Sequence, residues 1–281
     1  MKAFFVSDLH GKESRYRKLC ERIKADKPEV VFFGGDLYPS FKDMIKSEQS
    51  FFDDIFLTYF KNLKVELKED YPKMFIILGN DDPKLEEDRF FDKKYTEYWS
   101  YIHNQKVKFK DWNIFGYAFV PPTPFLNKDW EVYDVSRYVD PGCIHPTEGK
   151  RTVDPGRDIE YSTIKKDIEK LTEGFKPEKS LFLFHSPPYQ TNLDRAALDN
   201  MYFDHVPLDV HVGSIAIKEF IEQKQPFITM HGHIHESSRI TGEWKQIFGK
   251  TVSFNAAIDS NKLSIIIFDL KNPNNARREI L

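Results

Sequence analysis

The stretch AFFVSDLH at residues 3–10 decides how the chain is interpreted, because an apolar run, typical of a buried strand, ends directly in Asp8 and His10. The same order recurs in VVFFGGD at residues 30–36 and in MFIILGN at residues 74–80. Helical spacing of apolar residues separates these runs, which predicts a parallel sheet with helical connections. In such a sheet the carboxyl ends of the strands meet at one edge, where ligands bind.

The second half of the chain repeats this pattern with histidines. LFLF at residues 181–184 runs into His185, and FITM at residues 227–230 runs into HGHIH at residues 231–235. Six of the nine histidines lie between His185 and His235, a concentration not expected of scattered surface residues. Two more buried strands therefore deliver polar side chains to a sheet edge.

The remaining periodicity fills out an α/β fold. It predicts helices at residues 14–23, at residues 41–63 (one long helix or a pair), at residues 164–171 and after Ser214, a hairpin at residues 107–117, and closing strands near Ile240, at residues 252–254 and at residues 263–270. We found no internal repeat or linker, so we predict one domain over residues 1–281.

The composition excludes several classes of protein. Lys and Arg number 41 against 44 Asp and Glu, a net charge of −3, so no global positive field attracts nucleic acid or anionic lipid. The apolar run from Met1 to Val6 is too short for a signal sequence or a membrane span. Cys20 and Cys143 form no metal or redox spacing. We therefore expect free thiols and a cytoplasmic protein without a membrane partner.

Residues 121–157 differ in character from the rest of the chain. They are rich in Pro and Gly and show little periodicity, and long loops in compact domains are usually functional or disordered. Trp130, Tyr133 and Tyr138 indicate packing against another part of the molecule. We predict an insertion that acts as a lid.

The strand ends together offer oxygen and nitrogen ligands but no thiolate. The candidates are Asp8, His10, Asp36, Asn80, His185, His233 and His235. Seven donors suit a pair of divalent cations about 3.5–4 Å apart, with one bridging carboxylate. A single zinc site needs about three or four of them. Taken singly, Asp8-Leu9-His10 is also compatible with a helix N-cap, and Gly35-Asp36 and Gly79-Asn80 with ordinary turns. The histidines after the buried strand at residues 227–230 cost stability unless they are coordinated or solvated.

The order of these motifs resembles the calcineurin-like metallophosphoesterase family, over residues 1 to 235. The motifs that carry the resemblance are Asp8-x-His10, Gly35-Asp36, Gly79-Asn80, His185 and Gly232-His233-x-His235. The resemblance implies a four-layer sandwich of two mixed β-sheets flanked by helices, with metal ions at the carboxyl ends of the strands. It also implies a phosphoric ester hydrolase of the prokaryotic branch whose members often have no assigned substrate.

The resemblance further implies which residues hold each ion. One ion is expected on Asp8, His10, Asp36 and His235, and the other on Asp36, Asn80, His185 and His233, so that Asp36 bridges them. Mixed nitrogen and oxygen donors suit Mn, Fe or Zn. Two such ions lower the pKa of a bound water, so that hydroxide attacks the phosphorus in line with the leaving group.

One position departs from the family pattern. Many members have a histidine after Gly-Asn, where this chain has Asp81. Two dications would keep that carboxyl ionised and make it a poor proton donor. Three alternatives stay open: His211 or His205 donates the proton, the substrate has a good leaving group, or Asp81 points away. His211 precedes the helix capped by Ser214, where backbone N–H groups and an imidazole can face a phosphate.

The substrate class also stays open. A phosphodiester or phosphomonoester, as a small molecule, is the leading prediction. A nuclease of the same superfamily is disfavoured by the net charge and by the lack of a basic, aromatic groove. A protein phosphatase, or a metal-binding scaffold without turnover, are further alternatives. All seven ligand positions are retained, which favours an enzyme. The oligomeric state is not predicted.

Overall fold

The first sheet combines the N-terminal strands with the C-terminal hairpin. The structure is a computed structural model, which describes residues 1–40, 43–44 and 49–281. The strand order is β14-β13-β1-β2-β3-β4. Strands β1 (Lys2–Val6), β2 (Val30–Gly34), β3 (Lys73–Ile77) and β4 (Ser100–Tyr101) are parallel, whereas β13 (Ser264–Asp269) and β14 (Asn272–Ile280) pair antiparallel. The three parallel strands predicted from the apolar runs are confirmed.

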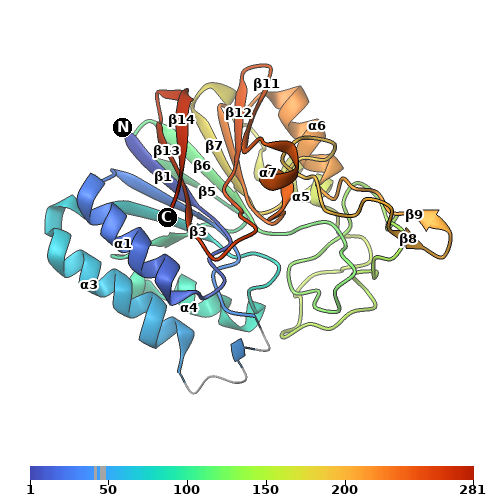
Figure 1. Cartoon of the computed structure of the whole chain (residues 1–281), viewed down its shortest axis with the longest axis horizontal. Helices are drawn as coiled ribbons and strands as arrows, with labels where there is room; N and C mark the ends of the chain where they lie inside the picture. Colours follow the sequence, from blue (N-terminus) through green and yellow to red (C-terminus); the bar gives the residue numbers. More distant parts are fainter. Residues whose placement is uncertain (41–42, 45–48) are drawn as a thin grey trace.

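The second sheet has the order β11-β12-β10-β7-β6-β5. The predicted hairpin is formed by β5 (Gln105–Phe109) and β6 (Trp112–Tyr117), and β7 (Ser180–Phe184), β10 (Ile228–His231) and β12 (Thr251–Asn255) run parallel to β6, with β11 (Lys245–Phe248) antiparallel. A separate short hairpin joins β8 (Tyr202–Phe203) to β9 (Val206–Pro207) and projects from the body of the molecule (Figure 1).

Helices cover the outer faces of the two sheets (Figure 1). On the first sheet lie α1 (Glu13–Asp26), α3 (Thr58–Leu67) and α4 (Glu87–Phe91), and on the second α5 (Ile164–Leu171) and α6 (Ile215–Lys224). Shorter helical turns are α7 (Ser237–Thr241), a π-helix at Phe51–Leu57, and 3-10 turns at Lys68–Asp70, Lys84–Glu86, Lys93–Tyr95 and Pro177–Lys179. The predicted mixed α/β sandwich of two sheets flanked by helices is therefore confirmed.

Burial explains why these segments take their structures. All five residues of β2 and all five of β7 are buried, as expected for strands covered on both faces. Helix α6 is capped by Ser214, whose hydroxyl accepts the N–H of Ile217, as predicted. Helix α1 begins at Glu13, one residue earlier than predicted, and ends where Lys27 adopts a left-handed conformation.

Three segments were predicted wrongly, incompletely or not at all. Ile240 was assigned to a closing strand, but it lies in α7, so that assignment was wrong. Strand β14 was not predicted, because its sequence is polar and mostly exposed. The helix predicted at residues 41–63 is confirmed at its C-terminal end, whereas residues 41–42 and 45–48 lie outside the described residues. None of the described helices has the length and apolar character needed to cross a bilayer.

Residues 121–157, which we predicted to be an insertion, contain a buried ion pair. The Lys128 ammonium lies 2.5 Å from Glu131, and both side chains are at most 1% exposed. Lys128 also donates to the carbonyl oxygen of Thr123, and the Thr123 hydroxyl donates to Glu131. Burial raises the pKa of Glu131 to about 7, although the Lys128 charge opposes this shift. The insertion therefore has a polar core of its own.

We predict that Lys128→Met destabilises the protein by about 3–5 kcal/mol, because it leaves Glu131 buried without a partner. The matched control is Arg137→Met, which removes a pair with Glu160 that is about half exposed and should cost about 0–1 kcal/mol. Chemical denaturation of the two variants measures both values. Equal effects would show that the buried pair does not stabilise the insertion.

Candidate metal centre

The two sheets meet at the carboxyl ends of β2 and β7. His185, directly after β7, has its Nδ1 atom 2.7 Å from the carbonyl oxygen of Gly34, the last residue of β2. A carbonyl oxygen only accepts hydrogen bonds, so Nδ1 must carry the proton. In a neutral His185 the other ring nitrogen, Nε2, then carries a lone pair, which is directed away from the strand.

That lone pair faces two further acceptors. His185 Nε2 lies 3.0 Å from Asn80 Oδ1 and 3.3 Å from Asp36 Oδ2. The Asn80 amide nitrogen donates to Asp81, which supports this orientation of the amide. Three acceptors cannot satisfy one another, so a proton or a cation must lie among them. His233 completes this group, with its ring 5.2 Å from that of His185.

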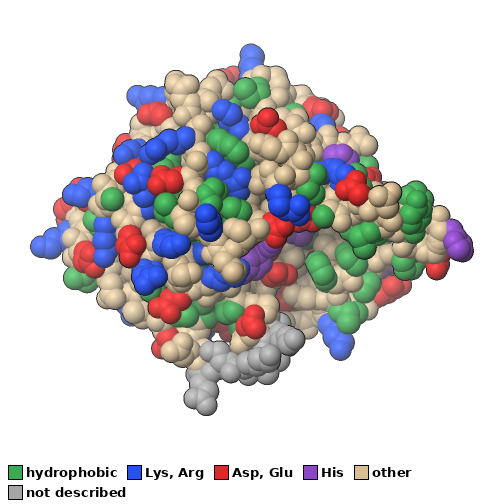
Figure 2. Space-filling view, in the orientation of Figure 1, with side chains coloured by type: hydrophobic (Ala, Val, Ile, Leu, Met, Phe, Trp, Pro, Cys, Tyr) green, Lys and Arg blue, Asp and Glu red, His purple; other side chains and the backbone are tan. Residues whose placement is uncertain are grey.

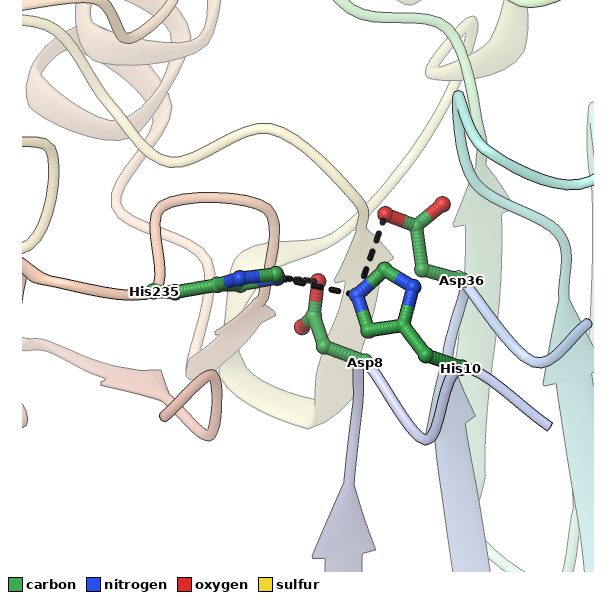
Figure 3. Close-up of side chains that lie close together, drawn as sticks. All are labelled: Asp8, His10, Asp36 and His235. Carbon is green, nitrogen blue, oxygen red and sulfur yellow. Dashed lines mark hydrogen bonds and ion pairs between the residues drawn. The ribbon is translucent and has the colours of Figure 1, made fainter. Parts of the chain in front are cut away.

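A second group lies on the other side of Asp36 (Figure 3). His10 Nε2 and His235 Nε2 are 3.0 Å apart, and His235 Nε2 is 3.1 Å from Asp8 Oδ1. The third distance, from His10 Nε2 to Asp36 Oδ2, is 4.0 Å. The side chains of Asp8, His10, Asp36 and His235 thus point toward one another from the ends of three strands. This donor set also fits a divalent cation.

The backbone is strained at this cluster. The φ angles of Asp8, His10, Asp36 and His233 are 57°, 48°, 52° and 71°, a left-handed region that non-glycine residues rarely adopt. Such strain costs about 1–3 kcal/mol per residue and gathers at functional sites. Close packing adds a further constraint, because a Cβ on Gly79 would lie 2.3 Å from Asp36 Oδ1.

Burial and neighbouring charges set the protonation of the cluster. Burial would raise the pKa of Asp8, but His235 and the other histidines hold it well below its usual range. Burial would lower the pKa of His185, but Asp36 raises it to about 10. Burial, together with the charge of His185, lowers the pKa of His233 to about 3. The carboxylates therefore attract a positive charge, and a bound metal would displace the His185 proton.

The comparisons with known proteins agree with this geometry. The sequence model described as calcineurin-like phosphoesterase matches residues 1–237. The chain belongs to this family. Among solved structures, TT1561 of Thermus thermophilus superposes with a TM-score of 0.57 at 14% identity, covering 99% of this chain and 98% of that one. A dimetal phosphatase from Danio rerio gives 0.50 at 8% identity, covering 95% and 92%. No curated protein sequence matches.

All seven residues predicted as ligands of this calcineurin-like phosphoesterase lie at the same sheet edges. Six of them form the two clusters that share Asp36, and Asn80 joins through its contact with His185. His231, the first histidine of the HGHIH stretch, is fully buried and bonded through both ring nitrogens, to Ser186 and Thr229. It is not part of either cluster.

Asp81 stays at the centre, so it does not point away. Its carboxylate accepts from Asn80 and lies 3.6 Å from His10 Nδ1. The charge of Asp36, and then burial, raise the pKa of Asp81 to about 7. We predicted an ionised Asp81 for a site that holds two dications, whose positive charge would lower this pKa. That prediction applies to the metal-bound protein and stays a prediction.

His211 and His205, the alternative proton donors, differ in environment. His211 Nδ1 lies 2.8 Å from a carboxylate oxygen of Asp194, a fully buried residue. Because a carboxylate only accepts, His211 Nδ1 donates this hydrogen bond. Among the described residues none bonds to His211 Nε2, and His211 forms no hydrogen bond, ion pair or ring contact with the seven candidate ligands. His205 is exposed in the turn between β8 and β9. Arg195, a nearby cation, is paired with Asp199.

Two supporting residues were missed by the sequence analysis. Asp82 is fully buried, and its carboxylate accepts the N–H groups of Tyr38 and Gly79 at 2.7 and 2.8 Å, so that it joins the loops of Asp36 and Asn80. Arg15 is buried in α1 and donates to the carbonyl oxygens of Asp8 and Ser260. An Asp before a proline hinted at a turn, whereas nothing in the sequence indicated Arg15.

We predict that Asp82→Ala lowers the free energy of unfolding by about 2–4 kcal/mol, because it leaves two buried N–H groups without acceptors. Asp82→Asn, which keeps one oxygen, should cost about half as much. Denaturant titrations measure both, with Asp111→Ala, an 81% exposed carboxylate, as control. If the three variants are equally stable, Asp82 does not hold the two loops together.

Proposed function

We propose that this calcineurin-like phosphoesterase hydrolyses a phosphodiester or phosphomonoester at a dinuclear metal centre. The observation that carries the proposal is the pair of donor clusters sharing the Asp36 carboxylate. One ion would be held by Asp8, His10, Asp36 and His235, and the other by Asp36, Asn80, His185 and His233. Two divalent ions there, Mn, Fe or Zn, would supply the positive charge that activates a water molecule and neutralises the phosphoryl oxygens.

The residues of the chain orient this centre. Gly34 fixes the His185 tautomer through its carbonyl group, and the N–H of Asp81 donates to Asp36 Oδ1 at 2.9 Å. The N–H of His233 donates to Asp8 at 3.0 Å. Because these contacts are made by backbone groups at strand ends, the ligand positions are set before any ion binds.

We further propose that His211 donates the proton to the leaving oxygen. The Asp194 carboxylate also accepts the N–H groups of Gln190, Thr191 and Gly213, so its position is fixed and it orients the imidazole. A histidine oriented by a buried carboxylate is a typical proton donor. The third candidate, Asp81, lies beside Asp36, where bound cations would keep it ionised.

We propose one domain with the insertion at residues 121–157 as its lid, a small-molecule ester as substrate, and the cytoplasm as location. A nuclease is the alternative enzyme, and a metal-binding scaffold is the alternative without turnover. Parallel assays of ester hydrolysis, single-stranded DNA cleavage and metal binding separate these three functions.

We predict that the chelator-treated protein binds two Mn²⁺ per chain and that Asp36→Asn weakens this binding more than about 100-fold. Loss of an outer hydrogen-bond partner alone costs about 10–100-fold in metal affinity, and Asp36 is the shared ligand. Calorimetric titration measures the affinity, and aryl phosphomonoester and phosphodiester assays follow in the same buffer. The control is Asp111→Asn, whose carboxylate is exposed. A wild-type protein that binds no metal would refute the proposal.

We predict that His211→Asn lowers kcat for an alkyl ester about 10²–10⁴-fold but changes kcat little for a nitrophenyl ester. The nitrophenolate leaves without a proton, whereas an alkoxide needs one. The control is His205→Asn, which should change neither rate because His205 is exposed in the hairpin turn. Equal loss on both esters would assign His211 a structural role instead.

A further inference from the structure

A cavity of 460 Å³ lies between the insertion and the segment that carries His211. Pro121, Tyr138 and Asp140 line one wall, and Tyr189 and Leu208 line the other. This volume is within the range of small-molecule pockets, about 300–1,000 Å³. Figure 2 shows hydrophobic side chains gathered on this side of the molecule, next to a hollow in which histidine and acidic side chains are visible.

The two walls of the cavity begin at the metal centre. Strands β6 and β7 are in register at Tyr117 and Phe184, and their next residues lead into the two walls. Tyr189 is four residues beyond His185, so their Cα atoms are at most about 14 Å apart. The N–H of Ala197 donates to Glu236, the residue after His235, which ties this wall to the other cluster. The cavity and the centre therefore share one sheet edge.

The charges of the lining select the ligand. The described residues that line the cavity include Asp134, Asp140 and Asp209 but no Lys or Arg. Asp134 is engaged by Ser214 and the N-terminus of α6. Asp140 and Asp209 are exposed, and Asp209 accepts the Tyr189 hydroxyl and the N–H of His211. An anionic group entering this cavity would be repelled, because like charges in a partly desolvated site are destabilising.

The apolar surface supplies the favourable contact. Prolines from the insertion, Leu198, Leu208 and the rings of Tyr138 and Tyr189 surround the space. His211 is the imidazole on the wall, with its Nδ1 atom bound to Asp194 and its Nε2 atom unbonded among the described residues. An apolar wall with a small number of placed polar groups is typical of a specific small-molecule pocket.

We propose that this cavity binds the alcohol part of the phosphate ester, and that this part is bulky, apolar and either uncharged or cationic. The inference rests on the proposed hydrolase function and adds the substrate class. It places the leaving oxygen at the mouth of the cavity, beside His211. Sugar phosphates with further anionic groups, nucleoside polyphosphates and nucleic acids are disfavoured by the same lining.

Three esters test the proposal: ethyl phosphate, 2-phenylethyl phosphate and 2-(4-carboxyphenyl)ethyl phosphate, each with its diester. The Mn²⁺-loaded protein should hydrolyse the phenylethyl ester with a kcat/KM about tenfold or more above both others, since apolar pocket contacts discriminate by about 10–200-fold. Equal kcat/KM values for all three would overturn the proposal while leaving the hydrolase function intact.

Filling the cavity supplies the matched variants. Leu208→Trp, or Val139→Trp on the opposite wall, should remove the preference for the phenylethyl ester over ethyl phosphate. Leu85→Trp, at a 62% exposed leucine outside the cavity, is the control and should change nothing. Thermal unfolding shows whether the two cavity variants are folded. If both are folded and still prefer the phenylethyl ester, the cavity is not the alcohol site.

A binding measurement separates failure of this inference from failure of the proposed function. Titration with 2-phenylethanol should show saturable binding that Leu208→Trp abolishes, whereas 4-(2-hydroxyethyl)benzoate should bind at least about tenfold more weakly. If no ester is hydrolysed but this binding pattern is found, the hydrolase function fails and the pocket stands. If 2-phenylethanol does not bind, or binds no better than the benzoate, the pocket proposal fails.

Discussion

The hydrogen bond from His185 Nδ1 to the carbonyl oxygen of Gly34 is the contact on which the centre depends. It joins the last residue of β2 to the first residue after β7, and so holds the carboxyl edges of the two sheets together. It also decides which ring nitrogen remains a lone pair. A residue with a side chain does not fit at position 35, because a Cβ on Gly35 would lie 2.6 Å from His185 Nδ1.

The geometry is understandable only if the cluster holds positive charge. Two carboxylates and an amide oxygen converge with four imidazoles. In several of their contacts, such as His185 Nε2 with Asn80 Oδ1 and His10 Nε2 with His235 Nε2, two lone pairs face each other unless a proton or a cation lies between them. Four left-handed residues add strain that a fold under selection for stability alone would avoid. The scaffold alternative requires the same cation, so turnover, not metal binding, distinguishes an enzyme from a scaffold in this family.

Strand ends were predictable and long-range polar contacts were not. Asp8, Asp36 and Asn80 follow continuous apolar runs, whose burial on both faces needs no knowledge of partners. Ile240 was misassigned because one apolar residue in a polar segment carries no period. Strand β14 pairs through its backbone, which its polar sequence does not reveal. Arg15 and Asp82 act on carbonyl and N–H groups of distant loops, and no spacing rule encodes such contacts.

The segment at residues 121–157 contacts the candidate metal centre and also lines the proposed pocket. Trp130 Nε1 donates to the carbonyl oxygen of Asp82 at 2.8 Å, and the Asn127 amide donates to that of Asn80 at 3.2 Å. The same segment supplies the prolines and Tyr138 that wall the cavity. A relative with a different segment here could keep the strand-end ligands and still lose the hydrogen bonds that Trp130 and Asn127 make to the ligand loop. Change in this segment would therefore alter ligand position and pocket shape together, since one buried polar core holds both.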